Sequence, residues 1–162
     1  MFSELDDRFD KMSEECGVFG IFNQNDLDVQ EITYLALYAL QHRGQESAGI
    51  AVSSEKGISY HKNSGLVAEV FDDQQLARLQ GGKAAIGHVR YTTSGDNQIA
   101  DAQPLVTKYK RGAMALAHNG SLINAEILRA DLEENGAIFQ TTLDIEVIAN
   151  LLARNIDDGL EE

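Results

Sequence analysis

The chain has 162 residues, enough for one domain with a sizeable core, and its 43% hydrophobic and 24% charged residues are typical of globular proteins. A formal net charge of −13 argues against a nucleic-acid partner, because phosphate binding needs clustered Lys and Arg side chains. One cysteine excludes an internal disulfide, and neither a secretory signal nor an apolar run long enough to span a bilayer is present. We therefore expect a cytoplasmic protein without a membrane partner.

Residues 1–15 form an acidic leader that contains six acidic and two basic side chains. Such a tail is usually solvated and has no role in chemistry. The only cysteine, Cys16, follows directly in the stretch SEECGVFGIF. A lone cysteine is most often a small hydrophobic side chain in a core, so a chemical role for Cys16 needs support from the rest of the chain.

Apolar patterns predict mixed secondary structure in the first half of the chain. A helix is expected over 28–44 with Asp28 as its N-cap, and the apolar positions at helical spacing are Ile32, Leu35, Ala36, Ala39 and Leu40. The other elements expected here are a buried strand at 16–23, two strands around a tight turn at 55–57, a strand at 65–71 and a short helix at 72–82.

Two segments of the second half, 84–95 and 112–122, share one design, a buried strand that runs into a polar loop. Helices are expected at 124–136, with Asn124 as the cap, and at 144–155, and a strand between them at 137–142. Mixed strands and helices with apparent hairpins predict a layered α/β or α+β sheet fold.

Charged and amide groups follow three of these buried elements. Arg90 presents a planar fork suited to a carboxylate, and Thr93 could add a hydroxyl donor. Asn119 offers a side-chain amide and Gly120 an unobstructed backbone N–H, the composition of an oxyanion hole. Asp144 could hold an ammonium group. Beside a thiol, these groups suit an amino acid whose side-chain carbonyl is attacked, and glutamine fits that description.

Each of these residues also has a simpler explanation. Arg90 could pair with one of the 26 acidic residues. The dipeptide Asn119-Gly120 is a strong signal for a hairpin turn, and Asp144 could merely cap the helix that follows it. The four histidines show no metal-ligand spacing, and with a single cysteine we expect no metal site.

Five motifs, in this order, resemble the glutaminase domain of the class II glutamine amidotransferases, whose nucleophile is N-terminal: CGVFGIF, LYALQHRGQESAGIAV, GHVRYTTSG, AHNGSLIN and TTLDIE. Within the family, QHRGQESAGI and HVRYTT are most similar to the branch that opens de novo purine synthesis. Glucosamine-6-phosphate synthases carry tryptophan in the arginine motif, and this chain has none. The resemblance implies an α+β fold, the four-layer αββα sandwich of two antiparallel sheets, truncated here at the C-terminus.

The resemblance also implies a mechanism for a domain spanning 16–162. Residues 1–15 would be a propeptide whose removal frees the α-amino group of Cys16, and that amine, with a reference pKa of about 7.7–8.0, would be the general base. The thiolate would attack the glutamine side-chain amide while Asn119 and the Gly120 N–H stabilise the oxyanion. Ammonia would leave, and water would hydrolyse the glutamyl thioester to glutamate.

Substrate-binding roles follow from the same resemblance. Arg90 and Thr93 match the positions that hold the α-carboxylate of glutamine, and Asp144 matches the one that holds its α-amino group. Leu143 and Ile145 replace the small hydroxyl residues that usually flank this aspartate, so the local geometry of Asp144 is open.

Three further positions match family motifs: Tyr91 lies in a loop that closes over glutamine, and Arg43 and Gly44 lie near the nucleophile. Members of the branch continue with more glutaminase domain and a phosphoribosyltransferase domain that uses Mg²⁺ and receives ammonia through a channel. No cofactor is expected in this chain, since one cysteine cannot hold the iron–sulfur cluster of some members, and Mg²⁺ would belong to the absent domain. The full-length protein is expected to be a homo-oligomer.

Two alternatives remain open at this point. The chain could be another amide hydrolase with an N-terminal cysteine, which would need no clamps for both a carboxylate and an ammonium group. It could also be a non-enzymatic glutamine-binding module whose leader is never removed.

Overall fold

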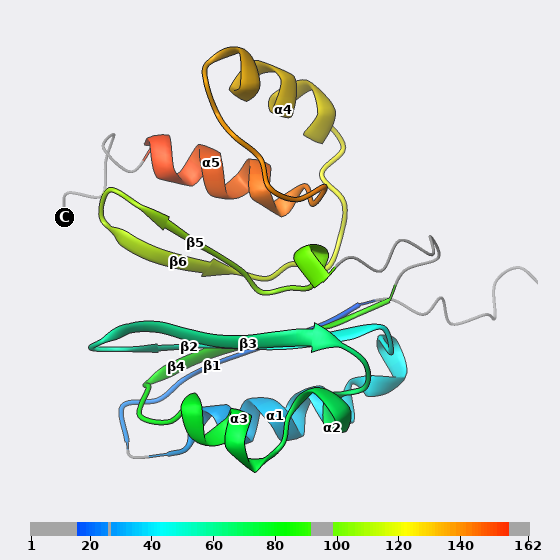
Figure 1. The fold of residues 1–162 in the computed structure, drawn as a ribbon, viewed down its shortest axis with the longest axis vertical. Coiled ribbons are helices and arrows are strands. Elements are labelled where there is room, and N and C mark those ends of the chain that lie inside the picture. Colours follow the sequence, from blue (N-terminus) through cyan, green and yellow to red (C-terminus); the bar gives the residue numbers. More distant parts are fainter. Residues whose placement is uncertain (1–15, 26, 92–98, 156–162) are drawn as a thin grey trace, which may run out of the picture.

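The structure is a computed structural model that describes residues 16–25, 27–91 and 99–155. Four layers follow one another: helices, a four-stranded sheet, a two-stranded sheet and helices (Figure 1). Neighbouring strands are antiparallel in both sheets. This is the αββα sandwich expected from the sequence. The propeptide expected at 1–15 and the site residue Thr93 lie outside the described residues.

The four-stranded sheet has the order β1-β4-β2-β3. Its strands are β1 (Gly17–Phe22), β2 (Ser47–Ser54), β3 (Gly57–Ser64) and β4 (Ala84–Arg90). Strands β2 and β3 form the predicted hairpin, which turns at Glu55 and Lys56. Gly17 pairs with Val89, so the start of β1 lies beside the end of β4. This register brings Cys16 next to Tyr91, the residue directly after β4.

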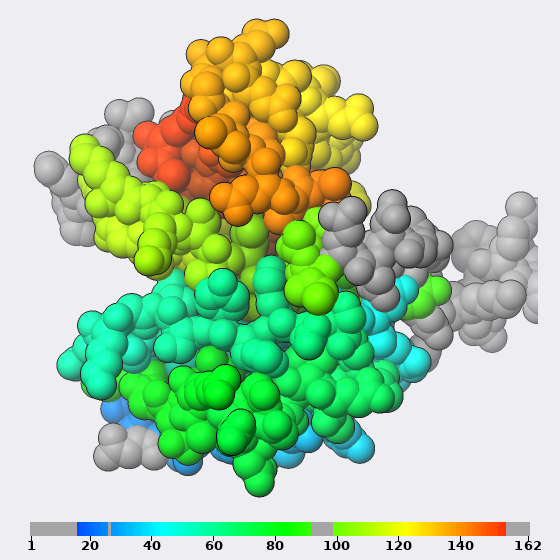
Figure 2. Space-filling model, in the orientation of Figure 1, coloured from blue at the N-terminus to red at the C-terminus, as the bar shows by residue number. Residues whose placement is uncertain are grey.

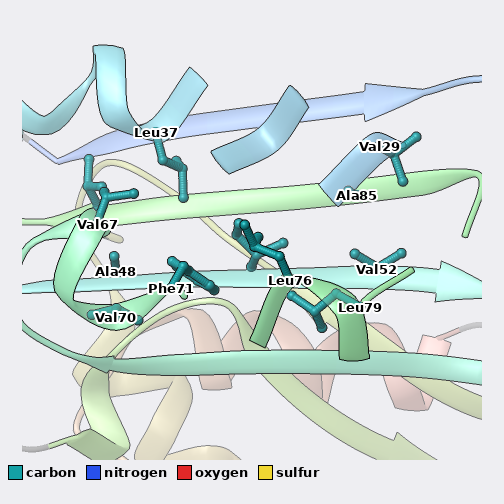
Figure 3. Packing of buried hydrophobic residues seen from close by; sticks show 12 residues of the cluster. Val29, Leu37, Ala48, Val52, Val67, Val70, Phe71, Leu76, Leu79 and Ala85 are labelled. Carbon is teal, nitrogen blue, oxygen red and sulfur yellow. The ribbon is translucent and has the colours of Figure 1, made fainter. Parts of the chain in front are cut away.

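Helices α1 (Val29–Ala39), α2 (Val67–Val70) and α3 (Asp73–Arg78) cover one face of this sheet (Figure 1). Their apolar side chains meet those of the sheet in a cluster of 12 buried residues (Figure 3). A short 3₁₀ helix, Gln41–Arg43, follows α1. Burial of this cluster stabilises this half, because it removes apolar surface from water.

Helix α1 presents a different face to the sheet from the one that its apolar spacing predicts. Leu35 is 62% exposed, and the buried residues of the helix are Val29, Gln30, Thr33 and Leu37. Thr33 tolerates burial because its hydroxyl donates a hydrogen bond to the carbonyl oxygen of Val29 at 2.7 Å. Gly87 of β4 lets α1 approach closely, since a methyl group there would lie 2.6 Å from Cγ2 of Thr33.

The strand predicted at 65–71 is wrong, because the segment contains helix α2. Gly65 turns the chain with a φ of +121°, and the Glu69 carboxylate then accepts a hydrogen bond from the Leu66 N–H at 2.9 Å. Val67 and Val70 lie one turn apart and both face the core. The short apolar run is therefore buried as a single helical turn.

The second sheet consists of β5 (Leu105–Tyr109) and β6 (Gly112–Leu116), which form a hairpin. Helix α5 (Ile145–Asn155) packs on it and α4 (Ala125–Glu134) packs on α5, while a 3₁₀ turn, Ile99–Asp101, precedes β5 (Figure 1). Strand β5 was not predicted from the sequence, whereas β6, α4 and α5 were.

The predicted N-caps are only partly right. Asp28 and Asn124 stand at the N-cap positions of α1 and α4, but neither side chain makes the capping hydrogen bond.

Among the described residues, no helix is both long and apolar enough to cross a membrane.

The strand predicted at 137–142 is also wrong, because no residue of this segment pairs in a described sheet. Instead, the Thr141 N–H donates to the carboxylate of Glu146 at 2.8 Å, and Arg129 donates to the carbonyl oxygens of Thr141 and Leu143 at 3.1 and 3.2 Å. Side chains satisfy these backbone groups, so the segment needs no strand partner.

The two sheet-and-helix halves meet along a seam that is visible in the space-filling view (Figure 2). We call them the β1–β4 half (residues 16–91) and the β5–β6 half (residues 99–155). The candidate site described next takes residues from both.

Candidate active site

Cys16 lies half-buried where β1 begins and β4 ends. Its thiol forms no disulfide, and the backbone N–H of Tyr91 donates to Sγ at 3.4 Å. The carbonyl oxygen of Tyr91 lies 3.6 Å from the same sulfur. The thiol therefore touches the backbone of Tyr91, directly after β4, and it is not enclosed in the core.

Two of the expected site residues bind the backbone of Cys16. The Asn119 side-chain amide donates to the Cys16 carbonyl oxygen at 2.6 Å, and Nε of Arg43 donates to the same oxygen at 3.4 Å. Gly44, directly after Arg43, lets the chain pass close to the end of β4, because a methyl group there would lie 2.7 Å from backbone carbons of Val89 and Arg90. The 3₁₀ helix after α1 thereby packs directly against the end of β4.

A pocket of about 620 Å³ opens at the seam between the two halves, in front of the thiol. Six of the residues expected at the site line it, namely Cys16, Arg90, Tyr91, Asn119, Gly120 and Asp144. The first three come from the β1–β4 half and the others from the β5–β6 half. Segments separated by more than 100 residues in the sequence thus share one concave surface.

The simpler explanation for Arg90 finds no support, since within residues 16–25, 27–91 and 99–155 no carboxylate forms a salt bridge with its guanidinium group. The hairpin turn considered for Asn119-Gly120 is wrong, because the dipeptide lies in the loop between β6 and α4 and joins no two strands. Gly120 has a φ of +153°, in the region that favours glycine.

Asp144 directly precedes α5, but its side chain is directed at another loop. Its Oδ2 accepts a hydrogen bond from the backbone N–H of Leu122 at 2.6 Å, and its Oδ1 lies 3.0 Å from Nε2 of His118. Asp144 stands at the N-cap position of α5, where its carbonyl oxygen accepts a hydrogen bond from the Val147 N–H at 3.0 Å. Both of its carboxylate oxygens, however, are held by the loop between β6 and α4 and do not cap the helix.

The unusual flanks of Asp144 have an explanation in packing. Ile145 is buried in the apolar cluster of the β5–β6 half, and Leu143 packs against that cluster. The packing of these two neighbours anchors the backbone on either side of Asp144. Small hydroxyl residues would have to achieve this with hydrogen bonds.

Three residues that shape the site were not singled out from the sequence, namely His118, Asp101 and Glu146. His118 lines the pocket, and Asp101 and Glu146 are buried carboxylates that bind the segment before Asp144. The place of His118 beside Asn119 in the AHNG motif was the available signal for it. For the two carboxylates no local pattern was informative, since burial of an acidic side chain depends on partners elsewhere in the fold.

His88 lies two residues before Arg90, on the same face of β4, and is fully buried. Neither ring nitrogen makes a hydrogen bond of good geometry within the described residues. Burial lowers the pKa of His88 to about 4; the nearby backbone of His118 opposes this shift, and the positive charge of Arg90 adds to it. The ring is therefore neutral at neutral pH and adds no charge to the pocket.

Among the described residues, no group of three or more His, Cys, Asp or Glu side chains is arranged to hold a metal ion. What the pocket does bring together is a thiol, a side-chain amide, a guanidinium group and a carboxylate. That set suits covalent attack on an amide carbonyl of a ligand that carries both an acidic and a basic group.

A family model described as the glutamine amidotransferase domain matches residues 72–162. The curated protein "Amidophosphoribosyltransferase 2, chloroplastic" of Arabidopsis thaliana is 50% identical over 152 residues, which cover 93% of this chain and 27% of that protein. The amidophosphoribosyltransferase of Methanocaldococcus jannaschii is 50% identical over 141 residues, or 87% of this chain and 30% of the relative.

Solved structures agree with these matches. The glutamine phosphoribosylpyrophosphate (PRPP) amidotransferase from B. subtilis, complexed with ADP and GMP, superposes with a TM-score of 0.75 at 46% identity. The match covers 85% of this chain and 29% of that one. A second structure, described as the allosteric regulatory enzyme of purine biosynthesis, gives a TM-score of 0.78. The chain thus spans less than a third of the length of the relatives it matches.

Proposed function

Because this chain belongs to the glutamine amidotransferase family, we propose that it is the glutaminase part of an amidophosphoribosyltransferase. It hydrolyses glutamine to glutamate and ammonia. In a protein of the relatives' full length, the ammonia reacts with phosphoribosyl diphosphate to give 5-phosphoribosylamine, the first step of purine synthesis. The support is the 50% identity to curated amidophosphoribosyltransferases over most of the chain.

The observation that carries the glutaminase proposal is the pocket itself, in which the thiol of Cys16 and three matching polar groups converge from distant segments. The proposed nucleophile is the Cys16 thiolate, and the proposed base is the α-amino group freed when residues 1–15 are removed. Attack on the side-chain carbonyl of glutamine forms a tetrahedral intermediate whose oxygen carries the negative charge. Ammonia leaves, and water cleaves the resulting thioester.

Asn119 can stabilise that oxyanion while it keeps its present contact. Its NH₂ group has two hydrogens, one of which is donated to the Cys16 carbonyl oxygen at 2.6 Å. The second hydrogen and the backbone N–H of Gly120 are the two proposed oxyanion donors. Because Asn119 holds Cys16 itself, the nucleophile and the oxyanion donor are positioned by one hydrogen bond.

Arg90 and Asp144 are the proposed clamps for the α-carboxylate and the α-ammonium group of glutamine. The guanidinium of Arg90 has no carboxylate partner among the described residues, so its planar fork is available to a ligand. Two roles stay predictions: Thr93 as a second hydrogen-bond donor to the α-carboxylate, and Tyr91 as part of a loop that closes over glutamine. So do the Mg²⁺, the ammonia channel and the homo-oligomer of the full-length protein. The cytoplasmic location is also untested, and one relative is described as chloroplastic.

The test is release of glutamate from glutamine by the purified chain, measured together with the intact mass. We expect activity only in protein whose mass shows the loss of Met1–Glu15, and none in a Cys16→Ala variant. Full activity of Cys16→Ala would contradict the nucleophile. A chain that always keeps the leader and hydrolyses nothing would favour the non-enzymatic binding module.

Arg90→Ala separates a glutaminase from a general amide hydrolase. We expect the KM for glutamine to rise about 100-fold, since a charged partner of the α-carboxylate is lost. A simple acyl amide without that carboxylate should be hydrolysed no better by the wild type than by the variant. Arg78→Ala is the matched control, because Arg78 is exposed on α3 away from the pocket. An unchanged KM in Arg90→Ala would contradict the carboxylate clamp.

A further inference from the structure

One side chain of the pocket, His118, has no part in the mechanism proposed above. Its Nε2 lies 3.0 Å from Oδ1 of Asp144, with the two side chains 25% and 22% exposed. The hydrogen bond between them is therefore partly shielded from water, which strengthens it relative to an exposed pair. A carboxylate oxygen can only accept, so in the neutral ring Nε2 carries the hydrogen and donates it to Asp144.

His118 is itself held in place from a third segment. Its backbone N–H donates to the side-chain oxygen of Gln103 at 2.7 Å, and Gln103 is buried just before β5. The ring also packs beside Gly120, where an added methyl group would lie 3.5 Å from its Cε1. A chain of contacts thus runs from Gln103 through His118 to Asp144, and it fixes the position of the ring.

The geometry of Asp144 leaves room for one more group. Within the described part of the chain, Oδ1 accepts one hydrogen bond, from His118, and Oδ2 accepts one, from the Leu122 N–H. A carboxylate oxygen has two acceptor positions, so one position on each oxygen remains for a ligand with several N–H donors. An ammonium group is such a ligand.

The charge on residue 118 decides how strongly that ammonium group is attracted. A neutral imidazole orients Asp144 through a hydrogen bond and leaves the carboxylate its full negative charge. A cation in the same place would pair with the carboxylate and cancel most of that charge before the substrate arrives. Either form can orient the carboxylate, but only a neutral donor also leaves it its full charge.

A second role for His118, as the base that activates Cys16, is not what the contacts indicate. Nε2 is committed to Asp144, and the described contacts of the thiol are with the backbone of Tyr91. We propose that His118 is a positioning residue that orients the Asp144 carboxylate toward the α-ammonium group of glutamine, and so makes the pocket selective for ligands with an α-amino group. This inference rests on the proposed glutaminase function.

The experiment compares two ligands that differ in one group, L-glutamine and glutaramate, the same molecule without its α-amino group. Binding is measured by calorimetry on the full chain with the Cys16→Ala substitution, so that nothing is hydrolysed. We expect His118→Ala to weaken glutamine binding about tenfold and to leave glutaramate binding unchanged. His118→Gln, which keeps a neutral N–H donor, should restore most of the glutamine affinity.

His118→Arg tests the charge argument. It should weaken glutamine binding more than His118→Ala does, while glutaramate binding is unchanged or stronger. His61→Gln is the control, since His61 lies on β3 with its Nε2 at the carbonyl oxygen of Val70, outside the pocket. If His118→Ala does not fold, as judged by its thermal unfolding, the comparison of His118→Gln with His118→Arg carries the test.

Turnover gives a second readout in the active chain. A positioning role predicts that His118→Ala raises the KM for glutamine and changes kcat by less than about threefold, whereas loss of a general base would lower kcat by about 100-fold or more. Equal weakening of both ligands, or of neither, would overturn the role of His118 and leave the glutaminase proposal standing. If the Cys16→Ala chain binds no glutamine and the wild type releases no glutamate, the proposed function fails and the inference falls with it.

Discussion

Each half of the molecule is stabilised internally by a different kind of interaction, although each contributes one wall of the same pocket. In the β1–β4 half, 12 buried apolar residues form one cluster, whereas the corresponding cluster of the β5–β6 half has three, Leu105, Ile145 and Ala149. The wall that carries Cys16 and Arg90 therefore rests on apolar packing. The wall that carries Asp144 has a smaller apolar cluster, so other interactions must hold its backbone in place.

Buried carboxylates supply that order. Asp101 is 4% exposed and accepts hydrogen bonds from the backbone N–H and the hydroxyl of Thr142 at 3.2 and 2.9 Å. Glu146, 8% exposed, binds the backbone N–H groups of Gln140 and Thr141 at 2.9 and 2.8 Å. Arg129 holds carbonyl oxygens of the same segment while its guanidinium lies 4.0 Å from the ring centre of Phe139.

The contrast teaches that the two walls should respond to different changes. Apolar side chains do not titrate, and their packing is weakened by a cavity, whereas a network of hydrogen bonds to charged groups depends on each donor and acceptor.

Leu37→Ala in the β1–β4 half should lower the free energy of unfolding by about 2–5 kcal/mol, because Leu37 is fully buried and its removal leaves a cavity. Urea denaturation measures this. Leu35→Ala on the same helix is the control and should change stability by less than about 0.5 kcal/mol, since Leu35 is 62% exposed. Equal losses in the two variants would refute the observed orientation of α1.

His88 at the seam should make the stability of the protein depend on pH. Its pKa is about 4 in the folded protein and about 6.5 in an unfolded chain, so the unfolded state binds more protons between these values. The contribution of the neutral ring is complete above pH ~6.5 and is lost as the pH falls to ~4, a difference of roughly 3 kcal/mol.

His88→Leu should remove this part of the pH dependence and cost little at pH ~7.5, because neither ring nitrogen has a good hydrogen bond to lose within the described residues. The measurement is urea denaturation of both proteins at several pH values, in which the titration of the carboxylates is common to both. Parallel curves for wild type and variant would show that burial of His88 has no such effect.

Gly49→Ala should loosen the contact between the two halves. A methyl group on Gly49 of β2 would overlap the carbonyl oxygen of Gln103 and lie 2.9 Å from Cδ of Pro104, so the segment before β5 would have to move. We expect a loss of about 1–3 kcal/mol and weaker glutamine binding. Gly20→Ala is the control, since its methyl group would meet only ordinary contacts, the nearest at 3.8 Å. Unchanged binding in Gly49→Ala would mean that the seam does not position the pocket.

Glu146→Gln should have the smallest effect on stability, about 1 kcal/mol, because the amide keeps one acceptor oxygen and turns its NH₂ group toward a backbone donor. The backbone at Gln140 and Thr141, which Glu146 holds, should then shift. This segment leads directly to Asp144, so the Kd for glutamine should rise about threefold or more. Calorimetry and urea denaturation measure the two effects. Glu133→Gln, on the exposed face of α4, should change neither. A loss of stability with an unchanged Kd would show that Glu146 supports the fold alone.

Much of the site was predicted from the order of short motifs. Cys16 was singled out as the only cysteine, and Arg90, Asn119 and Asp144 as polar groups that follow expected buried elements. The structure places all four at one pocket. Their chemical roles stay proposals. His118 was not singled out, because its importance depends on its contact with Asp144, 26 residues further along the chain.

Local patterns were enough to predict the β2–β3 hairpin, from two runs on either side of a tight turn, and helices α4 and α5, from the periodicity of their apolar residues. Periodicity is a local property, so it is encoded wherever an element buries one face. The tertiary structure alone decided the buried face of α1, the single helical turn of α2 and the irregular segment before α5. In each case a group outside the local pattern made the difference: Gly87 admits α1, the core takes both valines of α2, and Glu146 with Arg129 satisfies the backbone that a strand partner would have paired.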